Sequence, residues 1–160
     1  MNNKFPYKSI LIACSVNTAR SPMAEGFLKD FLTKKNSDHI DIFSCGVASN
    51  ARDGMLISMD AKMAMKEIGI ILSEDSMSID IKKHPELLKD VDLILTMTEQ
   101  HKLEIMQIDG AKDKEVYTLK EFAGECGDIE DPSMKELQGF RIARDEIRDC
   151  LLKGLKKYRF

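Results

Sequence analysis

Several features are scarce in this sequence, and each scarcity excludes a class of protein. Four prolines and nine glycines among 160 residues are too few for a fibrous or disordered chain. The apolar run at 10–13 is far too short for a membrane span or a secretory signal. We therefore predict a single folded domain over residues 1–160, in the cytoplasm and without a membrane partner.

The excess of one sign of charge is also small, because 24 lysines and arginines nearly balance 27 aspartates and glutamates and leave a formal net charge of −3. A nucleic-acid-binding protein usually presents a basic face, so we expect no nucleic-acid partner. The cysteines and histidines are scattered without the paired spacing of a zinc site, which predicts no metal, no other cofactor and no disulfide framework. We expect the three histidines, His39, His84 and His101, at the surface or as helix caps.

Apolar segments of two kinds alternate along the chain. Short β-prone runs predict strands at 9–13, 40–45, 91–97 and 116–119, and apolar residues at helical spacing predict helices at 22–35, 56–68, 99–108 and 133–158. Such alternation is typical of an α/β fold with a four-stranded parallel sheet and helices on both faces. Ligands bind these folds where loops leave the carboxyl ends of the strands.

The loop after the first predicted strand begins with Cys14 and closes with Arg20. Five intervening residues allow the backbone N–H groups to turn inward and form an anion-binding nest. The helix predicted to begin at Pro22 adds the positive end of its dipole, and the Arg20 guanidinium can hold two phosphate oxygens. This pattern predicts a phosphate site whose binding residues, beside Arg20, are Ser15, Val16, Asn17, Thr18, Ala19 and Ser21.

The same positive environment favours the thiolate form of Cys14, which is the reactive nucleophile. Attack on phosphorus would give a phosphocysteine intermediate that water hydrolyses. Ser21 is expected to be the N-cap of the following helix, and two interpretations of its role remain: capping alone, or capping together with donation of its hydroxyl to the Cys14 sulfur. Asn17 is expected to have a structural role, either by adopting a left-handed backbone or by bracing the loop with its side chain.

A second carboxylate-bearing loop precedes the last predicted helix. Asp131 lies there beside Pro132, whose ring fixes the local backbone. A phosphoryl transfer of this kind needs a general acid to protonate the leaving group. Asp131 is the candidate.

The strand, the Cys14–Arg20 loop and the following Ser21–Glu25 run resemble the low-molecular-weight protein tyrosine phosphatase family over nearly the whole chain. The further matches are Ser44-Cys45-Gly46, the runs 69–73 and 92–97, and Asp131-Pro132. The resemblance implies a four-stranded parallel sheet, Cys14 as nucleophile, Arg20 as phosphate ligand, Asp131 as acid and no metal. It also implies a phosphorylated protein as substrate, and we expect a monomer or a weak dimer.

Departures from the family pattern bear on the substrate. Thr18 stands where bacterial protein arginine phosphatases carry threonine and tyrosine-specific members carry isoleucine, which favours phosphoarginine over phosphotyrosine. Ser133 replaces an aromatic residue that lines the pocket. Ala19 replaces a second cysteine, so we predict easy overoxidation of Cys14. Val16 replaces a glycine and would strain the loop if that position needed a positive φ.

Two alternatives remain open from the sequence. A thioredoxin-coupled arsenate reductase resembles this chain but needs two further cysteines after the third strand, and residues 97–110 contain none. A non-catalytic phosphate-binding module would follow from a loop distorted at Val16, although such a module would need neither Cys14 nor Asp131.

Overall fold

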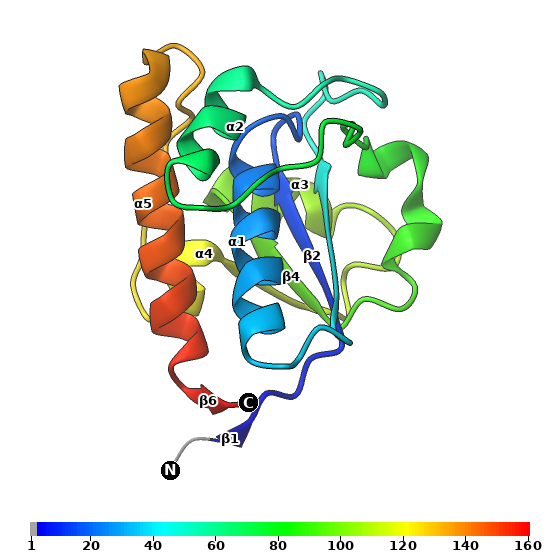
Figure 1. Ribbon diagram of the computed structural model, residues 1–160. Helices are drawn as coiled ribbons and strands as arrows, with labels where there is room; N and C mark the ends of the chain where they lie inside the picture. The colour runs from blue at the N-terminus through cyan, green and yellow to red at the C-terminus, as the bar shows by residue number, and fades with distance from the viewer. Residues whose placement is uncertain (1–2) are drawn as a thin grey trace.

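The computed structural model describes residues 3–160, and a parallel sheet forms its centre (Figure 1). All neighbouring strands of the sheet run parallel in the order β3-β2-β4-β5. A separate short ribbon pairs the two ends of the chain, β1 with β6, and was not predicted. The strands are β1 (Asn3–Lys4), β2 (Ser9–Cys14), β3 (Asp41–Gly46), β4 (Leu93–Thr96), β5 (Glu115–Thr118) and β6 (Tyr158–Arg159).

Helices cover both faces of the sheet, as the sequence predicts. On one face, α1 (Arg20–Lys34), α2 (Met59–Lys66), α4 (Leu119–Phe122) and α5 (Glu136–Leu155) pack together over one apolar cluster. On the other face, α3 (Glu99–Met106) and the 3₁₀ turns η1 (Ile81–Lys83) and η2 (Pro85–Leu88) cover a second cluster. The predicted α/β architecture is confirmed.

The central strand β2 explains where Cys14 points. All six of its residues are buried, because helices cover the sheet on both sides. Successive side chains alternate between the faces, so Ile12 and Cys14 join the α1 face while Leu11 and Ala13 join the α3 face. Cys14 is therefore the last residue of a buried strand, at the carboxyl edge of the sheet.

Some predicted boundaries are wrong, and tertiary contacts explain why. Helix α1 begins at Arg20 with Ala19 as its N-cap, so Ser21 lies inside the helix and does not cap it. Helix α2 begins at Met59 because Leu56 instead forms a β-bridge with Met77. The unpredicted helix α4 begins where the fourth predicted strand ends.

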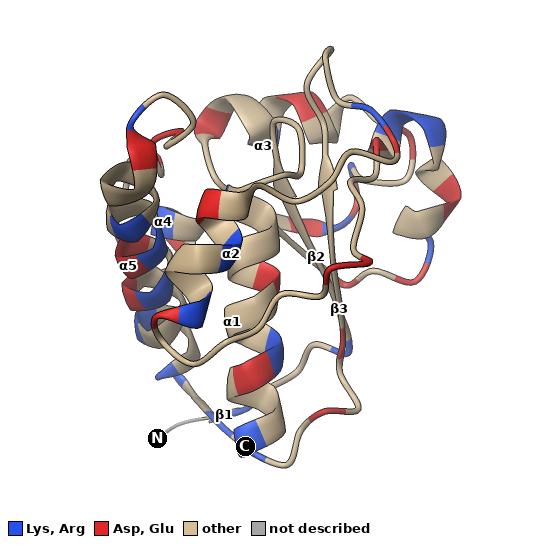
Figure 2. Cartoon of the chain, turned by 45° about the horizontal axis from the view of Figure 1, so that its top comes forward, with Lys and Arg blue, Asp and Glu red and all other residues tan. Residues whose placement is uncertain are grey.

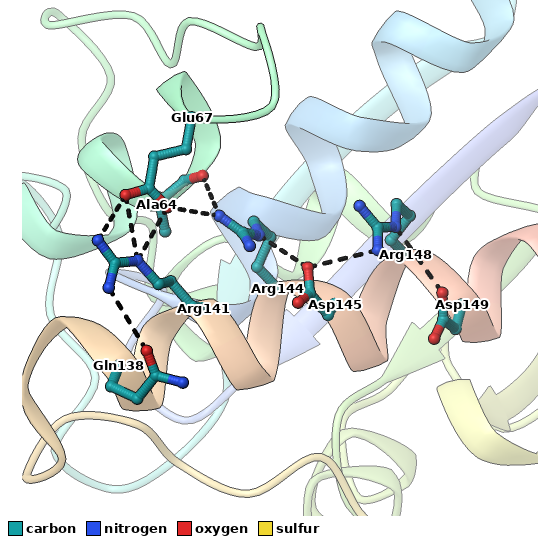
Figure 3. A network of polar contacts seen from close by, with 8 residues as sticks. All are labelled: Ala64, Glu67, Gln138, Arg141, Arg144, Asp145, Arg148 and Asp149. Atoms are coloured by element: carbon teal, nitrogen blue, oxygen red, sulfur yellow. Dashed lines mark hydrogen bonds and ion pairs between the residues drawn. The ribbon is translucent and has the colours of Figure 1, made fainter.

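Ion pairs join α2 to α5 along an exposed edge (Figure 3). The Glu67 carboxylate accepts hydrogen bonds from Arg141 and Arg144, with shortest distances of 2.7 and 2.8 Å. These hydrogen bonds lower the pKa of Glu67 to about 2. These contacts fix the C-terminal end of α2 against α5. At the other end of α2, the preceding residue Ser58 donates its N–H to the Thr18 carbonyl at 2.8 Å.

Charges of both signs are interspersed along α5 (Figure 2). Lysine and arginine side chains there alternate with aspartates and glutamates, as in the pairing of Arg148 with Asp145. Among residues 3–160, no helix combines the length and the apolar character that crossing a membrane requires.

Candidate active site

The loop between β2 and α1 is shaped by one left-handed residue and by close packing beneath it. Asn17 has a φ of 63°. Among residues 3–160 the other non-glycine residues with positive φ are Asn36 and Glu136, so Val16 does not require a glycine-like backbone. A Cβ on Gly46 would come within 2.8 Å of the Ser15 carbonyl oxygen, which explains why glycine is needed under the loop.

Cys14 lies at the base of this loop, and its side chain is almost fully buried. Its Sγ accepts the N–H of Asn17 at 3.3 Å and lies 2.9 Å from the Ser21 Oγ. When the sulfur is a thiolate, Ser21 must be the donor. The expected capping by Ser21 is wrong because Ala19 is the N-cap of α1, and the geometry fits the hydroxyl-donor role.

The side chain of Asn17 braces the loop from behind. Its Nδ2 donates to the Ser21 Oγ at 2.8 Å and to the Ser44 Oγ at 2.9 Å. Its Oδ1 accepts the backbone N–H of Ile79 at 2.9 Å. Asn17 thus combines both structural roles expected of it, the left-handed backbone and the side-chain brace. Both N–H groups of its amide and its amide oxygen thus have partners within the protein.

Arg20 joins the loop to the segment that carries the candidate acid. Its guanidinium is buried and donates from Nη1 to the Ile129 carbonyl at 2.8 Å and from Nη2 to the Ser15 Oγ at 3.2 Å. Nη2 also lies 3.9 Å from Oδ2 of Asp131. Through Arg20, the structure places Asp131 at the mouth of the Cys14 loop.

Asp131 is exposed and has two further donors on its other oxygen. The hydroxyl and the N–H of Ser133 donate to Oδ1 at 2.6 and 3.0 Å. Partial burial raises the pKa of Asp131, but the Ser133 hydrogen bonds and the Arg20 charge outweigh it, so the net pKa lies below the usual value. The free carboxylate is ionised at neutral pH.

The remaining loop residues lie between Cys14 and Arg20 and differ in burial. Ser15, Val16 and Thr18 are half-buried, whereas Ala19 is buried. Among residues 3–160, no three metal-ligating side chains gather at any point.

Sequence reasoning missed His101, which belongs to this site. The side chain is buried, contrary to the expected surface or capping position, and its Nε2 lies 2.7 Å from the Ser15 Oγ. Burial and the nearby Arg20 charge lower the pKa of His101 to about 4. Its place in the helix directly after β4, at the same sheet edge as the loop, was the signal that could have found it.

Among residues 3–160, the other cysteines do not gather beside Cys14 as a relay. Cys45 is buried on the opposite face of the sheet, Cys150 is buried in α5, and Cys126 is exposed. A reductase relay needs thiols that reach the nucleophile in turn.

Residues 9–158 match the family model described as low molecular weight phosphotyrosine protein phosphatase. A protein-arginine-phosphatase of Geobacillus stearothermophilus is 39% identical over 91% of this chain and 92% of its own length. An arsenate reductase of Halalkalibacterium halodurans is 38% identical, but over only 56% of each chain.

Two solved structures are similar over nearly their whole length. A low molecular weight protein tyrosine phosphatase from T. tengcongensis has a TM-score of 0.82 at 33% identity, covering 93% of this chain and 98% of that one. A mutant of the YwlE arginine phosphatase with a phosphorylated active-site serine has a TM-score of 0.81 at 34% identity, covering 94% and 97%.

Proposed function

The chain belongs to the low molecular weight phosphotyrosine protein phosphatase family, and from that premise we propose that Cys14, Arg20 and Asp131 are the catalytic residues with which it hydrolyses phosphorylated protein side chains. The observation that carries this proposal is the buried Cys14 Sγ, which receives an N–H at 3.3 Å and faces a hydroxyl at 2.9 Å. Such contacts stabilise a sulfur anion.

In the first step the Cys14 thiolate attacks phosphorus, forming a P–S bond while the bond to the substrate side chain breaks. The loop N–H groups and the Arg20 guanidinium hold the equatorial oxygens and stabilise their charge in the transition state. The proton of Asp131 passes to the leaving oxygen or nitrogen. Substrate binding prepares this acid, because a phosphate dianion both draws Arg20 away from Asp131 and adds negative charge beside it, and each change raises the pKa of the carboxyl.

In the second step water attacks the phosphocysteine and gives its proton to the Asp131 carboxylate. The P–S bond breaks, and the thiolate of Cys14 leaves with its charge stabilised by the Ser21 hydroxyl. The Ser21 Oγ is placed for this role by the Asn17 amide, which donates to it.

Phosphoarginine is the substrate that we favour over phosphotyrosine. Thr18 lies half-buried at the loop mouth, where a hydroxyl suits a polar guanidinium and a branched hydrocarbon suits an aromatic ring. The Ser133 hydroxyl, in the acid loop, donates a hydrogen bond to Asp131, and this side chain has no ring on which an aromatic substrate could stack. The similarity to a protein named as an arginine phosphatase supports the same choice.

The test compares hydrolysis rates on phosphoarginine and phosphotyrosine peptides for the wild type and for Thr18→Ile. We expect the arginine substrate to be faster and the ratio to fall in the variant. Thr33→Ile, at an exposed position near the far end of α1, is the matched control and should keep the wild-type ratio. A tyrosine preference unchanged by Thr18→Ile contradicts the substrate, and hydrolysis that survives Cys14→Ser contradicts the mechanism.

The same proposal covers the setting in which the protein works. A single domain over residues 1–160 acts in the cytoplasm as a monomer or weak dimer on phosphorylated proteins, without nucleic acid, metal or other cofactor. The interspersed charges on α5 support a protein without a nucleic-acid partner. The four free cysteines support a reducing compartment such as the cytoplasm. The alternative of a non-catalytic binding module depended on a loop distorted at Val16. The positive φ falls on Asn17 and not on Val16, which removes that argument.

A further inference from the structure

A buried histidine that the mechanism above does not use contacts the phosphate loop. His101 Nε2 lies 2.7 Å from the Ser15 Oγ, and the same oxygen accepts an N–H of Arg20 at 3.2 Å. The other ring nitrogen, Nδ1, is buried and has no hydrogen-bond partner among residues 3–160. The position of the imidazole proton therefore decides what Ser15 can do.

Two neutral tautomers are compatible with the short contact. If Nδ1 carries the proton, a buried N–H is left without an acceptor, and the Ser15 hydroxyl must donate to Nε2. If Nε2 carries the proton, it donates to Ser15, and the buried Nδ1 keeps only an unshared lone pair. Orphaned buried N–H groups are rarer than under-satisfied acceptors, so the second tautomer is favoured.

The His101 ring is neutral at physiological pH, chiefly because it is buried and also because Arg20 lies nearby. Burial and the Arg20 guanidinium oppose a proton, and together they outweigh the attraction of Asp128 and Asp131. A neutral ring with its proton on Nε2 is a donor to Ser15 and accepts nothing from it.

We infer that His101 is a positioning residue that turns the Ser15 hydroxyl proton toward the phosphate pocket, making Ser15 a donor to a substrate phosphoryl oxygen. The oxygen of Ser15 has two lone pairs, and the N–H groups of His101 and Arg20 occupy both. Its own proton is then free. Because Ser15 follows the nucleophile and lies within hydrogen-bond distance of the phosphate-binding arginine, a phosphoryl oxygen held by Arg20 is the acceptor within reach.

This inference rests on the proposed function, and its test separates the two. The affinity of inorganic phosphate, measured as its competitive inhibition constant against p-nitrophenyl phosphate hydrolysis, is compared among variants. Ser15→Ala should weaken phosphate binding by about ten- to a hundredfold, the effect of one hydrogen bond to a charged group. His101→Asn, whose amide is too short to reach Ser15, should weaken it to a similar degree.

Three further measurements separate positioning from a merely structural role. His101→Gln, whose amide N–H can occupy the place of Nε2, should restore phosphate affinity relative to His101→Asn. The double variant Ser15→Ala, His101→Asn should lose no more affinity than Ser15→Ala alone, because His101 acts only through Ser15. His39→Gln, at an exposed position, is the matched control.

The tautomer itself is measured in the wild type by ¹⁵N NMR of the imidazole, which needs no variant to fold. We expect a protonated Nε2 and an unprotonated Nδ1. A protonated Nδ1, or wild-type phosphate affinity in Ser15→Ala, overturns the inference even if the enzyme is active. A wild type that hydrolyses no phosphate ester contradicts the proposed function, while the NMR result still decides the tautomer.

Discussion

Asn17 offers the sharpest test of how the phosphate loop is held. The residue combines a left-handed backbone, at φ 63°, with three side-chain hydrogen bonds, two donated and one accepted. Replacement by glycine removes the hydrogen bonds but tolerates the backbone. Replacement by alanine removes the hydrogen bonds and adds backbone strain. The pair of variants therefore separates the two contributions.

The magnitudes follow from ordinary values for each contribution. Three hydrogen bonds, two buried and one partly buried, at about 1 kcal/mol each predict that Asn17→Gly lowers the free energy of unfolding by about 3 kcal/mol. A left-handed alanine costs about 1 kcal/mol more, so Asn17→Ala should lose about 4 kcal/mol. Asn36 is the control, since its φ is 56° but its side chain is exposed. There alanine should cost only about 1 kcal/mol, and glycine should be nearly neutral.

Urea unfolding of the four variants measures these differences, and hydrolysis of p-nitrophenyl phosphate measures their effect on the site. Both Asn17 variants should lose activity, because the amide that places the Ser21 hydroxyl is gone, while both Asn36 variants should keep it. If Asn17→Ala is no less stable than Asn36→Ala, the hydrogen bonds do not hold the loop. If alanine and glycine are equivalent at position 17, the left-handed backbone carries no strain.

Three other predictions address the acid, the α2–α5 contact and oxidation. Ser133→Ala removes a donor to the Asp131 carboxylate, so the pKa of that acid rises and the alkaline limb of kcat, which reports the enzyme–substrate complex, should move to higher pH; an unmoved limb refutes Asp131 as the acid. Glu67→Gln should destabilise the protein at pH 7 in urea unfolding. The pKa of Glu67 in the folded protein, about 2, lies below its usual 4.5. The difference in free energy of unfolding between the wild type and Glu67→Gln should therefore be full above pH 4.5 and vanish as the pH falls toward 2. A difference that does not depend on pH contradicts the ion pair. Peroxide should inactivate Cys14 irreversibly, because Cys45 lies on the other face of the sheet and cannot form a protective disulfide with it. Recovery of most activity with dithiothreitol would contradict that prediction.

The parallel core of the fold was predictable because its signals are local. Each predicted strand is a short apolar run, and each is confirmed within a few residues of its expected position. The pairing of β1 with β6 carries no such signal, because each strand has only two residues and neither strand is an apolar run. The two strands meet because α5 brings the chain back to its start. Helix boundaries also shifted where long-range contacts, such as the bridge of Leu56 to Met77, competed with the apolar pattern.

By itself, the sequence determined the spacing of Cys14 and Arg20 around a tight loop, and it singled out Asp131, beside Pro132, as the candidate acid. Those features depend on residues adjacent in the chain, whose geometry covalent bonds and turn preferences restrict. Only the tertiary structure decided that Ser21 faces the sulfur, that Arg20 reaches the Ile129 carbonyl, and that His101 touches the loop. The Arg20 and His101 contacts join segments far apart in sequence, so they exist only once the strands have aligned and brought their carboxyl ends to one edge. The Ser21 contact spans seven residues and depends on how the loop turns between β2 and α1.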